Sequence, residues 1–433
     1  MTTPASKTSS TQAVEASEQL LPGVGECPPL SDRDSLTSGY QPGPVAPMAE
    51  IDSRDFEESF GETLEQALDL DTWNDGQNLE AMFARLEQEV SQAVAQEDEL
   101  SRQVRRAIFP LLAKRPMAPR GAGVFRVTPR QLRDTQVNVL FNGGVEACDA
   151  SCAVHDTVPL TITQIGVCLV SYLGQQGAWG HRLYRKDFHQ HDRDPLNEVL
   201  EALQRRQQRG DDRDRPRDVL SELARRAFVS YAERAVLLGK ARAPWRMGRG
   251  QPASFELLTG SGSMEFFHKS LEVLEQLIFG IKRFVYVSSV PVSRDHLTIG
   301  HALQPLEFAI IQDSTHRLEQ ILTKGHLRGR HRKRAEEFIE EAGPAVLIGV
   351  YRTYAETPPQ VFFAHADFAQ DAALIAMADS LLQAQRAFPT LIDLAHSVCS
   401  SLFGSDGFSS TIEAAYARQG HPLRFLRQHS TLR

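Results

Sequence analysis

The stretch that most constrains this chain is residues 145–172, VEACDASCAVHDTVPLTITQIGVCLVSY. Its first part alternates apolar and polar side chains as far as Asp149, where the small polar triplet Asp-Ala-Ser interrupts the pattern. Residues 157–172 are mostly β-branched or apolar, and Gly166 is a breaker in the middle of the run. We therefore expect a strand that ends at Asp149, a turn, and a long second strand. This second strand is either buried on both faces or bent into a hairpin at Gly166.

Asp149 is the first candidate for chemistry. A carboxylate at the end of a central strand is costly to bury unless a cation or a hydrogen-bond donor neutralises it. Folds that carry out metal-dependent phosphoryl transfer place their first metal ligand at such a position. The alternative is a turn aspartate that caps its own backbone, which is the commoner role of an Asp-Ala-Ser triplet.

Length and composition limit the class of protein. The chain has 433 residues, of which 41% are hydrophobic and 24% charged, which suits a soluble protein of two domains, or of one large domain with appendages. No apolar run approaches the roughly 20 residues of a spanning helix, and the first residues lack the apolar core of a secretory signal. The odd number of cysteines, five, does not suggest a disulfide framework. We expect a cytoplasmic protein with reduced thiols that does not contact a membrane.

Three regions follow from the patterns along the chain. Residues 1–55 are rich in Ser, Thr, Pro and Gly and predict a disordered tail. Residues 56–120 predict a helical N-terminal segment, because apolar side chains recur every three or four positions over residues 78–112 and indicate one long amphipathic helix. Residues 121–433 predict the main domain.

Within the main domain, hydrophobic periodicity predicts alternating strands and helices. The expected strands, besides the first two, are residues 137–141, 179–187, 255–258, 284–288, 345–354 and 361–364. The expected helices are residues 195–208, 218–238, 264–279, 305–322, 370–386 and 391–403, with a charged loop over residues 207–217. An antiparallel pair followed by a strand–helix–strand unit predicts a mixed α/β sheet flanked by helices.

Two helical positions are further candidates for chemistry. Glu233 lies in the helix over residues 218–238, where the alternative is a solvated surface glutamate. Asp393 and His396 lie three positions apart among apolar residues and so share a helix face. The alternative for this pair is a helix-stabilising contact with no ligand.

Two segments are candidates for anion binding. The Gly-Ser-rich turn at residues 259–263 offers backbone amides, but it lacks the lysine of a P-loop, so we exclude a nucleoside-triphosphate site. Residues 324–334 hold six Lys or Arg in a chain of net charge −8, which favours local contact with a phosphate backbone over binding by bulk charge. The alternative is a solvated helix start. The basic positions are Lys324, Arg328, Arg330, Arg332, Lys333 and Arg334.

Taken in order, these segments resemble the NurA family of nucleases from residue 145 to the C-terminal region. The family's Asp-Gly-Ser strand motif corresponds to Asp149-Ala150-Ser151, and its helix glutamate corresponds to Glu233 in YAERAVLLGKA. Its Leu-Leu-Asp-Gly-Ser segment corresponds to residues 257–261, and its apolar strand with a basic or Ser-rich loop corresponds to FVYVSSVPVSR, ending at Arg294. Its Ala-His pair corresponds to residues 395–396.

One departure from the family pattern matters. The family's second aspartate falls on Thr259, and a hydroxyl binds Mg²⁺ or Mn²⁺ far more weakly than a carboxylate does. Either the metal is held by Asp149 and Glu233 with a neighbouring group such as Glu256, or catalysis is impaired.

The resemblance implies a ribonuclease-H-like mixed sheet, a homodimer, and a Mn²⁺- or Mg²⁺-dependent nuclease acting on DNA ends or single strands. It also implies a hexameric HerA-type translocase as partner, in DNA end processing or antiphage defence. Asp149, Glu233 and His396 would be catalytic, with the metal on Asp149, Glu233 and Glu256. Arg294 and the six basic residues of 324–334 would contact DNA. The alternative is a catalytically impaired DNA-binding or docking subunit of such a complex. A third, lower-ranked interpretation is an unrelated α/β protein.

Overall fold

The computed structural model describes residues 53–73, 79–156, 160–174, 176–187, 223–288, 293–325 and 327–420. The expected tail up to residue 52, the helix over 195–208 and the charged loop over 207–217 lie outside the described residues. The chain divides into two compact units, Met1–Gln77 and Asn78–Arg433. The first contains the short helices α1 (Ser53–Phe60) and α2 (Leu64–Leu68), the second of which begins with a capping box made by Thr63 and Gln66.

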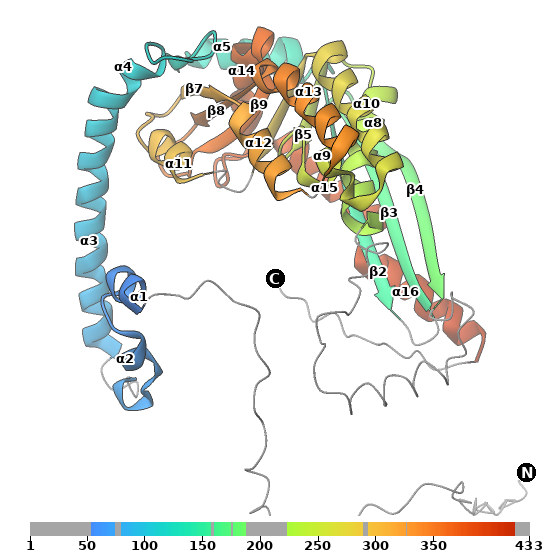
Figure 1. Cartoon of the computed structure of the whole chain (residues 1–433), viewed down its shortest axis with the longest axis horizontal. Helices are drawn as coiled ribbons and strands as arrows, with labels where there is room; N and C mark the ends of the chain where they lie inside the picture. Colours follow the sequence, from blue (N-terminus) through green and yellow to red (C-terminus); the bar gives the residue numbers. More distant parts are fainter. Residues whose placement is uncertain are drawn as a thin grey trace, which may run out of the picture. The chain divides into compact units, whose positions relative to one another are not determined.

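The long helix expected near the N-terminus of the second unit is confirmed (Figure 1). It runs from α3 (Leu79–Gln103) through a π-helical turn (Val104–Ile108) into α4 (Phe109–Leu112). The wider turn fits Pro110, which has no amide to offer the preceding turn. Arg105 attaches this helix to the sheet by donating to Glu307 at 2.7 Å. No helix among the described residues is both long enough and apolar enough to cross a bilayer.

The centre of the second unit is a nine-stranded mixed sheet with the order β1-β7-β8-β9-β6-β5-β2-β3-β4. β2, β3 and β4 form an antiparallel meander, β5 runs parallel to β2, and β6 runs parallel to β5. The strands are β1 (Gly123–Arg126), β2 (Val145–Asp156), β3 (Leu160–Val170), β4 (Gln176–Asp187), β5 (Trp245–Arg249), β6 (Phe284–Ser288), β7 (Glu307–Asp313), β8 (Val346–Arg352) and β9 (Gln360–His365). The mixed sheet flanked by helices that the sequence predicted is confirmed.

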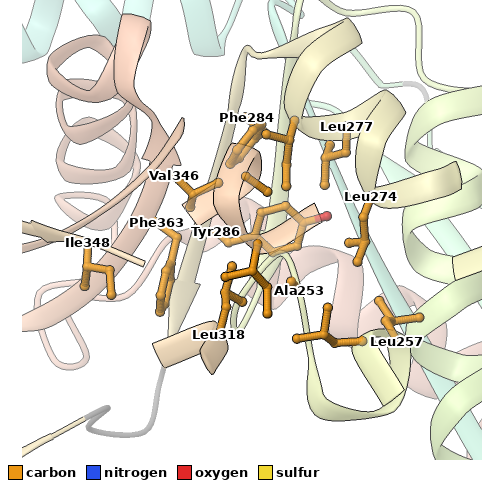
Figure 2. Packing of buried hydrophobic residues seen from close by; sticks show 14 of the residues in the cluster. Ala253, Leu257, Leu274, Leu277, Phe284, Tyr286, Leu318, Val346, Ile348 and Phe363 are labelled. Carbon is orange, nitrogen blue, oxygen red and sulfur yellow. The ribbon is translucent and has the colours of Figure 1, made fainter. Parts of the chain in front are cut away.

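Helices cover both faces of this sheet, and each face has its own core. The first face carries α8 (Phe228–Gly239), α9 (Phe255–Thr259), α10 (Met264–Glu275), α12 (Thr315–Lys324) and α13 (Gly329–Ala345). Figure 2 shows Tyr286 of β6 in the middle of this core. The second face carries α5 (Pro129–Thr135), α14 (Ala369–Ser380) and α15 (Thr390–Phe403). Successive side chains of a strand alternate between the two cores, as Ala147 and Cys148 of β2 do.

Two helices lie outside these layers. α11 (Arg294–His301) contacts β7 and β8, and α16 (Ser405–Arg418) contacts β2. β2, β3 and β4 extend beyond the other strands towards α16 (Figure 1).

The sequence predicted a turn after Asp149, and this prediction is wrong. β2 continues without interruption to Asp156, and Asp149, Ala150 and Ser151 all pair with β3. The small side chains of Ala150 and Ser151 are compatible with a strand, because the backbone of β2 is held in register by its pairing with β3. Nor does Gly166 bend β3. It is needed because a Cβ there would lie 2.0 Å from ring atoms of Phe403, which packs across the strand.

Three other expected elements are wrong. Residues 137–141 fall largely in a π-helical turn (Gln136–Leu140), residues 255–258 lie in α9, and residues 307–313 form β7 instead of a helix. Short apolar runs do not distinguish strand from helix by themselves. Gly260, with a left-handed φ of 68°, ends α9 in the way glycine commonly ends helices. The first strand of the βαβ unit is therefore β5.

We expect Gly166→Ala to lower the free energy of unfolding by about 3 kcal/mol, because an added methyl group collides with the Phe403 ring and the core is closely packed. Urea unfolding followed by circular dichroism measures this. Gly177→Ala in β4 is the matched control, since its Cβ would meet no atom within 4 Å. Equal stability of the two variants would contradict the packing explanation.

Candidate functional site

The site forms where the short strand β5 ends beside the longer strand β2. Their parallel pairing runs from Val145 opposite Trp245 to Cys148 opposite Gly248. Beyond Cys148 that edge of β2 has no strand beside it within the pairing described. Asp149, although it lies within β2, therefore stands at the carboxyl end of the neighbouring parallel strand. Such ends are where open α/β sheets commonly bind ligands.

His396 of α15 contacts Asp149 directly, across 247 positions of sequence. Asp149 follows Val145 and Ala147 on the second face of the sheet, where α15 packs. Nδ1 of His396 and Oδ2 of Asp149 are 2.6 Å apart. The Asp149 side chain is 5% exposed, whereas that of His396 is 50% exposed. The contact therefore fixes one ring nitrogen inside the protein and leaves the opposite edge of the ring near solvent.

The expected pairing of His396 with Asp393 does not form. Asp393 instead accepts a hydrogen bond from Arg386 at 2.7 Å. On the other side of the ring, Nε2 of His396 lies 3.5 Å from the Ser400 hydroxyl, one helical turn further along α15.

Burial raises the pKa of Asp149 above its ordinary value. The hydrogen bond and charge of His396, the charge of Arg249 and the amide of Ala150 act in the opposite direction. The carboxyl group is thus held in a low-dielectric place and receives only part of the charge compensation that it needs.

Glu233 approaches the same edge of β2 from the first face. It lies on α8, its side chain is 17% exposed, and it forms an ion pair with Arg234 at 2.7 Å. Burial, together with the negative charge of Asp149, raises the pKa of Glu233 to about 7 although Arg234 lowers it. The amide of Ala150 interacts with both Glu233 and Asp149. The charges of the two carboxyl groups therefore act on each other, and the groups repel each other when both are charged.

Arg234 holds Glu233 in place. Its buried guanidinium donates to three backbone carbonyls, those of Ser230 at 3.0 Å, Gln251 at 2.6 Å and Pro252 at 3.1 Å. It also lies 5.3 Å from the centre of the Tyr286 ring. The solvated-surface alternative for Glu233 thus does not describe its surroundings.

The other predicted residues lie elsewhere. Glu256 is in the first turn of α9 and takes no part in the contacts described above. Thr259 ends α9, is 6% exposed, and donates its hydroxyl to the carbonyl of Phe255 at 2.7 Å. Arg294 begins α11 and is exposed. The metal-binding and DNA-binding roles of these residues remain predictions.

The basic run lies at the end of α12 and the start of α13, on the first face of the sheet, whereas His396 is on the second. Half of its charges have acidic partners: Arg332 with Glu336 at 2.9 Å, Lys333 with Glu337 at 3.9 Å, and Arg334 with Glu275. The structure does not bring this run together with Asp149 and His396.

Arg249, the last residue of β5, was not predicted from the sequence. Its charge acts on Asp149, which is the next position of β2 beyond the paired residues. An arginine directly before a glycine at the end of WRMGRG is the only signal the sequence contains, and it means little until β5 is known to lie beside β2.

Asp149 and Glu233 are the two carboxylates of this site that could hold a divalent ion. Among the residues that the structure describes, no group of three or more His, Cys, Asp and Glu side chains is gathered tightly enough to hold a metal alone. Mg²⁺ is nevertheless commonly bound through one or two carboxylates, with water and substrate phosphate completing its shell. Two mutually repelling, partly compensated carboxylates suit that arrangement, because a cation between them would favour their charged forms.

Over most of its length the chain is similar to solved structures of NurA nucleases. It shares 10% identity with NurA from Sulfolobus solfataricus at a TM-score of 0.38, covering 77% of this chain and 98% of that one. For a NurA structure bound to dAMP and manganese the identity is 9%, the TM-score 0.35 and the coverage 75% and 93%. For endonuclease V from Bacillus subtilis the identity is 8% and the TM-score 0.25, and the match covers 72% of this chain and 91% of that one.

No family model matches the chain, and no curated protein matches it. Likeness at this level says nothing of activity, which has to be judged from the residues of the site.

The position of Thr259 leads to an expectation for Thr259→Asp. A carboxylate there is buried without a cation, so the free energy of unfolding should fall by about 3 kcal/mol with no gain in metal binding. Thr259→Val, which loses only one hydrogen bond, should cost about 1 kcal/mol. Urea unfolding and Mn²⁺ titration calorimetry measure both. Tighter Mn²⁺ binding by a stable Thr259→Asp variant would show that this position belongs to the site.

The raised pKa of Glu233 leads to a pH dependence. Because the folded value of about 7 exceeds the ordinary 4.5, the folded state binds more protons between these values, and stability should fall as pH rises through them. Glu233→Gln should therefore reduce the fall of stability with rising pH. It should not abolish this fall, because the pKa of Asp379 is also raised to about 7 and contributes to it. Urea unfolding at several pH values tests this, with exposed Glu272→Gln as control. If the stability of Glu233→Gln depended on pH as steeply as that of the wild-type protein, the prediction would be contradicted.

Proposed function

We propose that this chain is a NurA-like, divalent-metal-dependent DNA nuclease. The observation that carries the proposal is the 2.6 Å contact between Asp149 and His396, which come from a strand and a helix far apart in the sequence. Glu233, from a second helix, is near enough for the charge of Asp149 to raise its pKa. We assign Asp149 and Glu233 as ligands of Mg²⁺ or Mn²⁺. His396 is assigned to proton transfer.

The protein's part in the chemistry follows from the contacts. A bound divalent ion supplies an activated water and neutralises charge on the leaving oxygen. Asp149 accepts from Nδ1–H of His396 and thereby fixes the ring orientation and tautomer. Nε2 then faces the exposed side, where it takes a proton from the water or gives one to the leaving oxygen.

The surfaces beyond the site support roles for partners. Exposed large apolar side chains follow α3, among them Phe83, Leu86, Val90 and Val94, and we assign this helix to a contact with a second copy or with a HerA-type hexameric translocase. We assign Arg294 and the basic run at 324–334 to guiding DNA. Because the run lies on the opposite face from His396, it would hold DNA away from the scissile phosphate. Such a complex would act in DNA end processing or antiphage defence.

A second candidate is a DNA-binding subunit that does not cleave. Two observations favour it: Arg234 already neutralises Glu233, and a cationic arginine at 249 stands next to Asp149. Both reduce the net negative charge available to a metal. Affinity for DNA that needs no metal and falls steeply with salt would fit this candidate.

Asp149→Asn separates the two. We expect the purified protein, with its translocase where needed, to degrade linear DNA with Mn²⁺, and the variant to lose at least about 100-fold in rate, because it loses a metal ligand and the partner that orients His396. Asp371→Asn, an exposed aspartate of α14, is the matched control.

Cleavage by Asp149→Asn at the parent's rate would show that the site is misassigned. A parent that binds DNA but cleaves none of it with any divalent ion would support the second candidate.

A further inference from the structure

Arg249 stands out as the cation of this site that no internal partner holds. It ends β5 one residue beyond Gly248, which pairs with Cys148 of the parallel strand β2, and Asp149 is likewise one residue beyond Cys148. Strand alternation places it on the same face as Trp245 and Met247, the face of α15 and His396.

The ring of Phe388 supports the guanidinium of Arg249, and among the described residues no acid is hydrogen-bonded to it. The group lies 5.7 Å from the centre of the ring of Phe388, which is 2% exposed. Its Nε atom is buried, and among the described residues it has no hydrogen-bond partner. Asp149 is near enough for the charge of Arg249 to lower its pKa, yet the Asp149 carboxylate makes its hydrogen bond to His396. Arginines that serve only structure are normally hydrogen-bonded when their donors are buried.

The contrast with neighbouring arginines supports a different role. Arg386 stacks on the same Phe388 ring, also at 5.7 Å, but is bound to Asp393. Arg234 is bound by Glu233 and three carbonyls. Within the described part of the site, Arg249 alone combines a fixed aromatic support with unused donors.

We propose that Arg249 binds a backbone phosphate of DNA beside Asp149 and His396, and does so without a metal ion. This proposal rests on the proposed function in taking DNA as the ligand. A guanidinium offers paired N–H donors that match two oxygens of one phosphate, and aromatic stacking reduces the conformational freedom lost on binding. In a site with only two carboxylates, one divalent ion and one arginine would then together neutralise the negative charge of the substrate.

The test measures binding, not cleavage. A fluorescent single-stranded oligothymidylate is titrated with wild-type protein and variants in EDTA, and anisotropy is recorded at several salt concentrations. We expect Arg249→Gln to weaken binding about tenfold or more and to reduce the slope of log K against log salt by about one. Arg249→Lys should keep most of the slope while losing part of the affinity, because it retains the charge but not the paired donors.

The matched control is Arg130→Gln in α5, which removes the same charge from a side chain that is 91% exposed. It should bind within about twofold of wild type. Binding by Arg249→Gln equal to wild type, an equal loss in Arg130→Gln, or no binding by the wild-type protein in EDTA would each overturn the proposal. Should Arg249→Gln fail to fold, as judged by circular dichroism, an Arg249→Lys variant with a reduced salt slope would also overturn it.

The outcome is independent of catalysis. If Asp149→Asn cleaves like its parent while Arg249→Gln loses DNA binding, the nuclease assignment fails and the phosphate assignment stands. If Asp149→Asn abolishes cleavage and Arg249→Gln binds normally, the reverse holds.

Discussion

The site depends on a difference in strand length. β2 has twelve residues and its parallel neighbour β5 has five, so β5 stops where Asp149 begins an unpaired stretch of β2 edge. A buried backbone amide without a partner is costly, and the amide of Ala150 at this edge interacts with the carboxylates of both faces. At this gap in the ladder, α15 contributes His396 from one face of the sheet and α8 contributes Glu233 from the other.

The charges of neighbouring side chains then determine how two acidic residues can be buried at this site. Two acids of raised pKa lie together at low exposure, and each has one cationic or potentially cationic partner: His396 for Asp149 and Arg234 for Glu233. Arg234 is fixed by backbone carbonyls, which makes the Glu233 half of the site rigid. The His396 half is half-exposed and therefore open to a ligand. Under the proposed function, this asymmetry would place metal binding nearer the interior and proton transfer nearer solvent.

The sequence alone predicted the mixed sheet and the long helix, and it named both Asp149 and His396, which the structure brings into contact. It failed where local patterns mislead. Asp149, Glu233 and His396 were found through short motifs taken in order, because residues 247 positions apart leave no local sign of contact. Thr259 was placed at a strand end because LLTGS resembles one, yet Gly260 ends a helix there. Arg249 was missed because β5 carries Arg246 and Arg249 in only five residues, a composition that hides a strand until its buried partners are known.

The placement of His396 also depends on an acid outside the site. Asp379, at the end of α14, accepts the hydroxyl of Tyr172 at 2.5 Å and the amide of Leu391 at 2.9 Å. Leu391 lies in the first turn of α15, where an amide has no partner within the helix and a carboxylate complements the helix dipole. Tyr172 follows β3, the strand paired with β2. The buried carboxylate of Asp379 thus connects the start of α15, which carries His396, to the hairpin that carries Asp149. At the other end of α15, Phe403 packs over Gly166 of the same hairpin. The 2.6 Å contact between His396 and Asp149 is therefore set from both ends of α15.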